Sequence, residues 1–269
     1  MASLALQSAV TGLNALATEL DIISNNLANA NTTAFKSQRA NFEDLMYQQK
    51  KQPGVENANG DRTPAGLQVG LGTQVSNTQF DFSVGSARPT GRPLDVYIEG
   101  DGFLEVGILS EQGGGVGYTR AGNLFSNEDG DLVVGNSQGP LLEPAINIPP
   151  GSTGLSISAD GTVSVIADGD TDATEVGQLA FSTFVNREGL RSIGGNVYVE
   201  TAASGPPIQG TPGEGGFGTV LQGHLENSNV NPVTELVGLI RTQRAFEMNS
   251  QSIEAADEVM QTVGQLGRR

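Results

Sequence analysis

Residues 231–266 read NPVTELVGLIRTQRAFEMNSQSIEAADEVMQTVGQL, and this stretch decides the fold. Asn231 is a favourable helix N-cap, and Pro232 suits the first helical position because its missing N–H has no intrahelical partner there. Beyond it, two sets of positions recur at heptad spacing. The first set is Leu239, Phe246, Ile253 and Met260, and the second is Thr242, Asn249, Ala256 and Val263. The pattern predicts one helix about 50 Å long, with a seam for a partner helix.

The N-terminus has a matching pattern. Its apolar residues step by three and four over more than three heptads, at Leu6, Ala9, Leu13, Leu16, Leu20, Ile23, Leu27 and Ala30. We expect a helix from a cap at Ser3 to about Leu27 or Ala28, because the Asn- and Thr-rich run that follows favours side-chain-to-backbone hydrogen bonds. The two seams can pair with each other or with other copies. The predicted fold class is α+β, with long N- and C-terminal helices that pair as a coiled coil and an inserted all-β domain.

The composition and charge of the 269 residues separate the ends from the middle. Residues 1–50 and 231–269 each have a net charge of −1, whereas residues 51–230 hold 21 acids and 7 bases. This distribution indicates ends that pack and a middle that stays in solvent, and it argues against nucleic acid as a partner. The absence of cysteine excludes disulfides and thiolate metal sites. We find neither a transmembrane span nor a cleavable signal peptide, and we expect no membrane insertion.

Short strands and turns fill the middle of the chain. Two hairpins are predicted in this region. Strand-like segments that end at Phe125 and begin at Leu132 flank the turn around Asp129-Gly130, and apolar residues alternate on both sides of Asp160-Gly161. A further strand is predicted over residues 176–185, and the whole region should hold about ten strands. The predicted domains are an N-terminal helix (1–35), a connecting segment with an extended loop (36–80), a β-rich outer domain (81–221), and a return segment with the C-terminal helix (222–269).

Candidate catalytic and ligand-binding motifs are weak. His224 is the only histidine, so schemes that need two are excluded. Residues 168–172 have the first spacings of a calcium loop, but Leu179 stands where the loop needs Glu. Glycines in residues 213–218 fit G-x-G-x-x-G, yet no helix is predicted after them to bind phosphate. We predict no catalytic residue, metal or cofactor.

Two phrases at the ends of the chain identify a family. The run from Asn25 to Lys36 closely resembles the N-terminal signature of the axial proteins of the bacterial flagellum, the rod and hook family. Residues 226–231 and 235–247 resemble the C-terminal signature of the same family. The matching positions of the first signature are Asn25, Asn26, Leu27, Ala28, Asn29, Phe35 and Lys36. In this family the two termini form a helical coiled-coil layer that lines a tube, which agrees with the heptads.

A loop after the first signature narrows the resemblance. Residues 47–54, together with 66–72, resemble an insertion typical of the distal-rod members of the family. The matching loop positions are Gln52, Pro53, Gly54, Gly66, Leu67, Val69 and Gly70. The resemblance implies that this loop distinguishes a straight, rigid rod from a bendable hook.

The resemblance implies a structural subunit of the flagellar basal-body rod. Many copies would polymerise helically into a rigid drive shaft that crosses the periplasm and transmits motor torque to the hook. The implied partners are further copies of the chain, other rod proteins, the hook protein and the surrounding ring proteins, and export would leave the N-terminus uncleaved. The predicted assembly interface is Leu6, Leu13, Leu16, Leu20, Ile23, Leu27, Leu239, Phe246, Asn249, Ile253, Met260 and Val263.

Two alternatives stay open at this stage. Within the family, the chain could be a proximal rod or hook subunit, although hook subunits usually have an additional β domain for which 269 residues leave little room. Outside the family, a secreted β-rich adhesin or binding module with dimerising termini would explain the acidic β region. It would not explain two terminal seams beside the Asn-rich phrases.

Overall fold

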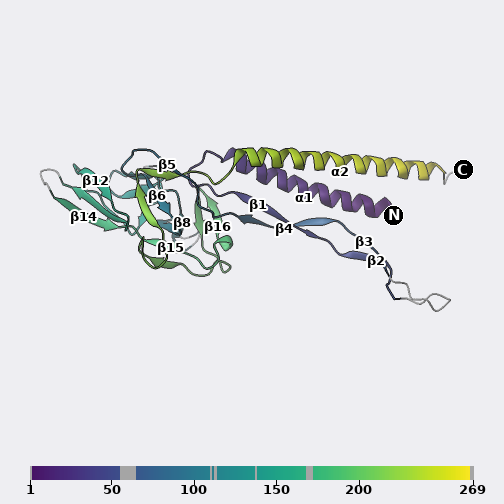
Figure 1. Cartoon of the computed structure of the whole chain (residues 1–269), viewed down its shortest axis with the longest axis horizontal. Coiled ribbons are helices and arrows are strands. Elements are labelled where there is room, and N and C mark those ends of the chain that lie inside the picture. Colours follow the sequence, from purple (N-terminus) through teal and green to yellow (C-terminus); the bar gives the residue numbers. More distant parts are fainter. Residues whose placement is uncertain are drawn as a thin grey trace. The chain divides into compact units, whose positions relative to one another are not determined.

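A computed structural model describes residues 2–54, 65–109, 111, 114–136, 138–167 and 172–266. The chain forms two compact units (Figure 1). The helical unit consists of Met1–Ala28, Gln38–Phe80 and Asn231–Arg269, and the β unit consists of Asn29–Ser37 and Asp81–Val230.

Both predicted terminal helices are present in the helical unit. They are α1 (Ala2–Ala28) and α2 (Pro232–Leu266), and they run side by side in opposite directions (Figure 1). The predicted cap of α2 is confirmed, because Asn231 Oδ1 accepts hydrogen bonds from the backbone N–H groups of Val233 at 3.1 Å and Thr234 at 3.4 Å. The Ser3 side chain, the predicted cap of α1, lies outside the described part of the structure. In the described residues, no helix is long and apolar enough to cross a membrane.

Two antiparallel ribbons complete the helical unit. Strand β1 (Gln38–Asp44) pairs with β4 (Thr73–Phe80), and β2 (Tyr47–Lys51) pairs with β3 (Leu67–Gly70). Strands β1 and β4 pack against α1, where the Thr73 N–H donates a hydrogen bond to Thr11 Oγ1 at 3.3 Å. The β2–β3 ribbon has no such cover, and all five residues of β2 are exposed.

The β unit is built from short antiparallel strands. Its largest sheet has seven strands, in the order β16-β17-β8-β7-β15-β18, with β11 paired to β7. A three-stranded sheet, β12-β13-β14, and several two-stranded pairs complete it. The strands are β5 (Ala87–Pro89), β6 (Val96–Glu99), β7 (Phe103–Gly107), β8 (Val116–Thr119), β9 (Leu124–Ser126), β10 (Leu132–Val134), β11 (Leu142–Glu143), β12 (Thr153–Ile157), β13 (Thr162–Ile166), β14 (Ala173–Gln178), β15 (Phe181–Thr183), β16 (Arg191–Gly194), β17 (Val197–Val199), β18 (Ile208–Gly210), β19 (Thr219–Gln222) and β20 (His224–Glu226).

The strands confirm some sequence-based predictions and correct others. The hairpins around Asp129-Gly130 and Asp160-Gly161 are present as β9–β10 and β12–β13, and both glycines have positive φ angles, 89° and 79°. The predicted count of about ten strands is too low for the described β unit, because many of its strands have only two to four residues. The single strand predicted over residues 176–185 is wrong. The chain leaves the three-stranded sheet after β14 and enters the seven-stranded sheet at β15.

The core of the β unit lies under the seven-stranded sheet. Its most deeply buried apolar side chains include Leu104, Val106, Leu124, Val163 and Phe181, each at most 1% exposed. They come from strands of different sheets, so their packing joins these sheets into one body. Aromatic side chains pack on the other face of β7, where Phe103 makes edge contacts with Phe82 and Phe184.

Candidate assembly site

The two terminal helices contact each other, and two glycines mark points of close approach. A Cβ atom on Gly12 would lie 2.9 Å from Asn249 Nδ2, and one on Gly238 would lie 3.6 Å from Ile23 Cδ1. These two contacts place the helices in an antiparallel register. Gly12 is therefore a point of close approach, where a larger residue would displace the Asn249 side chain.

Most of the predicted interface residues are buried or half-buried in the single chain. Ile23 is 8% exposed and Thr242 is 5% exposed. The half-buried members are Leu6, Leu13, Leu16, Leu20 and Leu27 on α1, and Leu239, Phe246, Asn249 and Ile253 on α2. Met260 is the exception at 46% exposed. The side chain of Val263 lies outside the described residues.

A second apolar face of α2 remains uncovered. Its exposed side chains are Val233 (70%), Leu236 (44%), Val237 (43%), Ile240 (50%), Met248 (62%) and Val259 (57%). We call these six residues the outer stripe. The predicted heptads did not include this stripe because they describe one seam only, although Val233, Val237 and Ile240 are also spaced to share one face of a helix. Helix α2 thus has apolar surface for more than one neighbour.

The family-signature residues make specific local contacts. Asn26 is 2% exposed, and its side chain exchanges two hydrogen bonds with the backbone of Gln38, at 2.8 Å and 3.0 Å. The Asn26 side-chain amide thereby binds the first residue of β1 to the last turn of α1. Asn29 and Thr32 close the turn that follows, through a side-chain hydrogen bond of 3.0 Å. Phe35 is half-buried, whereas Asn25 and Ala28 are exposed at the end of α1.

Lys36, the last signature residue, belongs to a buried ionic cluster in the β unit. Its Nζ lies 2.6 Å from Glu226 Oε1, and Arg120 Nε lies 2.8 Å from Glu226 Oε2. The three side chains are 1%, 0% and 3% exposed. We call Lys36, Arg120 and Glu226 the junction cluster. No local sequence pattern indicates Arg120 or the role of Glu226. Arg120 lies 106 residues before Glu226 in the chain, and Lys36 lies 190 residues before it.

Hydrogen bonds to the backbone extend the junction cluster. Arg120 also donates to the carbonyl oxygens of Ile98, Gly100 and Gly102, at 2.9, 3.0 and 2.7 Å. The second partner of Lys36 is a carbonyl oxygen, that of Ser83. Burial lowers the pKa of Lys36 from its ordinary value of 10.5, the Glu226 carboxylate raises it again, and the Arg120 guanidinium lowers it further. The net result is a lowered pKa, because the effect of burial outweighs the attraction of the Glu226 carboxylate.

The cluster lies where the chain enters and leaves the β unit. The Ala34 N–H donates to the Glu226 carbonyl at 2.8 Å, and the Ser37 N–H donates to Asn229 Oδ1 at 2.8 Å. Segment 34–37, which follows α1, is therefore bound to segment 226–229, which precedes α2. Both signature phrases of the sequence contribute to this junction.

The rod-type loop positions lie on or beside the β2–β3 ribbon. Gln52, Pro53 and Gly54 follow β2 and are exposed, and residues 55–64 of the loop lie outside the described residues. A Cβ atom on Gly66 would lie 2.6 Å from the Lys51 carbonyl oxygen, so glycine is required where the chain returns. Leu67 is 55% exposed, whereas Val69 and Gly70 are half-buried. A two-stranded ribbon with so little cover is marginally stable by itself.

Comparison with known proteins identifies the family. Residues 6–36 match the model of the flagella basal body rod protein, residues 97–165 match the flagellar hook protein FlgE/F/G D1 domain, and residues 221–266 match the flagellar basal body rod FlgEFG protein C-terminal domain. The chain is 45% identical to the flagellar basal-body rod protein FlgG of Buchnera aphidicola subsp. Schizaphis graminum, over 95% of this chain and 96% of that protein.

The chain belongs to the FlgG family of flagellar basal-body rod proteins.

Further FlgG proteins show how far the similarity extends. The chain is 41% identical to FlgG of Caulobacter vibrioides over 97% of its length, and 40% identical to FlgG of Borreliella burgdorferi over 98% of its length. These matches cover 98% and 99% of the two relatives. The resemblance to the distal-rod members is therefore confirmed, and the chain is a structural protein, not an enzyme.

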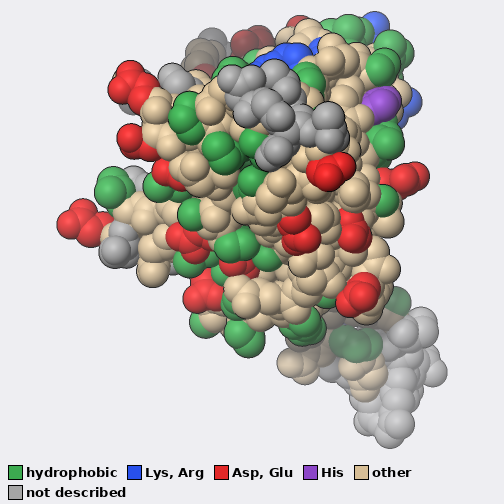
Figure 2. Space-filling model, turned by 90° about the vertical axis from the view of Figure 1, so that its left-hand side faces the viewer, with side chains coloured by type: hydrophobic (Ala, Val, Ile, Leu, Met, Phe, Trp, Pro, Cys, Tyr) green, Lys and Arg blue, Asp and Glu red, His purple; other side chains and the backbone are tan. Residues whose placement is uncertain are grey.

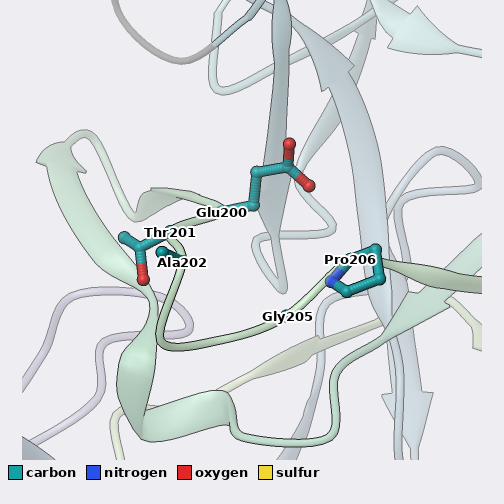
Figure 3. A pocket seen from close by; sticks show the side chains of 5 residues that line it. All are labelled: Glu200, Thr201, Ala202, Gly205 and Pro206. Atoms are coloured by element: carbon teal, nitrogen blue, oxygen red, sulfur yellow. The ribbon is translucent and has the colours of Figure 1, made fainter.

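The motifs that the sequence left as weak candidates have these surroundings in the structure. A hollow of about 420 Å³ is lined by Glu200, Thr201, Ala202, Gly205 and Pro206. In Figure 3 Glu200 and Pro206 lie on opposite sides of it, and Glu200 is the only ionisable group among the five. The lone His224 contacts a backbone carbonyl, that of Gln222, at 2.9 Å. Within the described residues no group of three or more His, Cys, Asp or Glu side chains could hold a metal, and residues 168–171 of the rejected calcium loop lie outside them.

Acidic side chains cover much of the β unit. Figure 2 shows Asp and Glu spread over the face at the end formed by β12–β14, whereas the visible Lys and Arg side chains lie near its upper edge, beside the histidine. This arrangement agrees with the excess of acids in residues 51–230. Such a surface remains soluble and repels other acidic surfaces.

Proposed function

We propose that the chain polymerises helically, through its terminal helices, into the rigid rod that transmits motor torque to the flagellar hook. Family membership identifies the chain as a rod protein but does not say which surfaces hold the copies together, and we propose these surfaces here. One observation supports it best: α2 has one apolar face that packs on α1 and a second, the outer stripe, that is uncovered.

Burial of the outer stripe would supply the free energy of assembly. Full burial of one Val, Leu, Ile or Met side chain is worth about 1.5 to 3 kcal/mol. The six residues of the outer stripe are 43 to 70% exposed in the single chain. Burial of this exposed surface can therefore support a stable contact with a helix of the next copy. The same contact recurs at every subunit of the lattice.

The two helices of each copy would form the inner wall of the tube as a coiled coil. In this arrangement the heptad seam from Leu6 to Ile253 holds α1 and α2 together, and Met260 and Val263 extend it to a neighbouring copy. We propose the division into residues 1–35, 36–80, 81–221 and 222–269 on the same basis, with 81–221 as the outer domain. Contacts between different patches, which do not close into a ring, would give an open helix.

The β2–β3 ribbon would stiffen the polymer. All five residues of β2 are exposed, and the large Tyr47 and Leu67 side chains are 56% and 55% exposed. A neighbouring copy would cover this surface. A ribbon that bridges two copies blocks the sliding between them that bending requires. Exposed charges such as Lys50 and Lys51 would add less than about 1 kcal/mol each.

The remaining parts of the proposal concern place and partners. The rod would cross the periplasm, with the acidic β units towards the surrounding ring proteins, and would join other rod proteins and the hook protein. Export would occur without removal of a signal peptide. The family membership supports these statements, and the acidic surface of the β unit fits a rod that must turn without sticking to its surroundings.

Substitution of one outer-stripe residue tests the proposal. In Val237→Asp a charge replaces an apolar side chain that is 43% exposed in the single chain. We expect helix content by circular dichroism to be unchanged and the concentration needed for polymerisation, measured by sedimentation and electron microscopy, to rise at least tenfold. The control is Val185→Asp, the same change at a valine of the β unit that is 84% exposed. Polymers of Val237→Asp at wild-type concentrations would refute the proposed interface, and curved rather than straight polymers of the wild type would indicate a hook subunit.

A further inference from the structure

The junction cluster contains one more buried cation than its charge balance needs. Arg120 and Glu226 form a neutral ion pair at 2.8 Å, and Lys36 adds a second positive charge at 2.6 Å from the same carboxylate. All three side chains are at most 3% exposed. Removing a charge from water costs several kcal/mol, which only excellent pairing offsets.

Arg120 and Glu226 bind backbone groups at several places in the β unit. Arg120 donates to the Ile98 carbonyl of β6 and to the Gly100 and Gly102 carbonyls of the turn that follows, and Glu226 Oε1 accepts the Gly85 N–H at 2.8 Å. Both residues therefore hold strands of the β unit together. Lys36 instead comes from segment 34–37, and its two partners are Glu226 and the Ser83 carbonyl, at 2.6 Å each.

Stability alone does not explain the choice of lysine at this position. Apolar residues of similar volume often replace buried ions without loss of stability. The lowered pKa of Lys36 also shows that its surroundings disfavour the charge. A buried ion pair, however, fixes one arrangement of its two partners more sharply than an apolar contact, which tolerates sliding.

The neighbouring contacts show which arrangement Lys36 fixes. Segment 34–37 is joined to segment 226–229 by three hydrogen bonds, from the Ala34 N–H to the Glu226 carbonyl, from the Asn229 N–H to the Phe35 carbonyl, and from the Ser37 N–H to Asn229 Oδ1. All three bonds are neutral, and Lys36 lies among these residues of segment 34–37. The first segment follows α1 and the second precedes α2.

We propose that Lys36 is a positioning residue for assembly: its ion pair with Glu226 fixes the segment that follows α1 against the segment that precedes α2. In this role Lys36 is needed for polymerisation and not for the folding of the β unit. The inference rests on the proposed assembly through the terminal helices, and it adds a residue outside those helices that holds together the two segments adjoining them in sequence.

The test is Lys36→Met, which keeps an unbranched side chain and leaves the neutral Arg120–Glu226 pair in place. We expect the melting temperature to change by less than about 4 °C, the shift that roughly 1 kcal/mol causes in a domain of this size. Amide hydrogen exchange of residues 33–37 should become at least tenfold faster, and the polymer yield at a fixed concentration should fall at least tenfold. Arg88→Met, which removes an exposed cation from the same unit, should change none of the three.

Each result decides the proposal. Loss of the folded β unit in Lys36→Met would show a purely structural role and overturn it, as would unchanged exchange and unchanged polymerisation. Lys36→Arg keeps the charge and should restore slow exchange and polymers. If Lys36→Arg shows the same fast exchange and low polymer yield as Lys36→Met, the ion pair does not position segment 34–37. If the wild-type chain itself fails to polymerise, the proposed function fails, whereas the exchange measurement still tests the placement of segment 34–37.

Discussion

Glu226→Gln should destabilise the β unit more than any change to a surface carboxylate. The substitution keeps the shape of the side chain but removes the one anion between Lys36 and Arg120, which are 1% and 3% exposed. Removing one partner of a buried ion pair costs about 3 to 5 kcal/mol, and here two cations lose their partner, so we expect the upper half of that range. Such a loss is a large fraction of a total stability of about 5 to 15 kcal/mol.

Urea denaturation followed by tyrosine fluorescence measures this loss. The chain has no tryptophan, and three of its four tyrosines, Tyr97, Tyr118 and Tyr198, lie in the β unit. The signal therefore reports on the unit that contains the junction cluster. The matched control is Glu128→Gln, an exposed carboxylate of the same unit, whose effect should stay within about 0.5 kcal/mol. A loss below about 1 kcal/mol for Glu226→Gln would refute the reasoning that the cluster depends on this carboxylate.

Three further predictions concern the helices, the ribbon and the tyrosines. Phe246→Asp places a charge on the face of α2 that contacts α1, and we expect circular dichroism of the single chain to show a loss of helix while the tyrosine signal stays native; unchanged helix content would contradict the pairing. Deletion of residues 53–64 should leave subunits that polymerise into more flexible or curved tubes, and straight tubes of wild-type stiffness in electron micrographs would rule out the proposed role of the ribbon. Burial raises the pKa of Tyr118 from 10.0 to about 12. The unfolded chain therefore loses this proton first as the pH rises, and Tyr118 by itself should lower the free energy of unfolding by about 1 kcal/mol between pH 10 and pH 11. Burial also raises the pKa of Tyr198, so the full loss measured by urea denaturation should be larger, and Tyr118→Phe should reduce it by about 1 kcal/mol. A pH dependence that is unchanged in Tyr118→Phe would show that Tyr118 does not contribute.

The helices were predictable because their signals are local. Asn231 and Pro232 mark the start of α2, and the Asn-rich run after Ala28 marks the end of α1, so both boundaries follow from a few neighbouring residues. The hairpins at Gly130 and Gly161 were predictable for the same reason, because a positive φ angle is encoded by the glycine itself.

The non-local contacts could not be predicted in this way. Nothing near Lys36 in the sequence indicates that its partner is Glu226, 190 residues away, and Arg120 is one of several arginines between short strands. The pairing of β1 with β4, which brings Gln38 opposite Phe80, depends on a loop whose length does not specify the register. The outer stripe was not predicted for another reason. Helix α2 has apolar residues on two faces, and the heptad pattern describes only one of them.

Electron cryo-microscopy of the concentrated full-length chain tests the central claim most directly. The account predicts straight helical tubes in which α1 and α2 form the innermost layer, with the outer stripe of one copy against a helix of the next and the acidic β units outside. Dispersed single chains at high concentration, or tubes whose inner wall is formed by the β units, would contradict it.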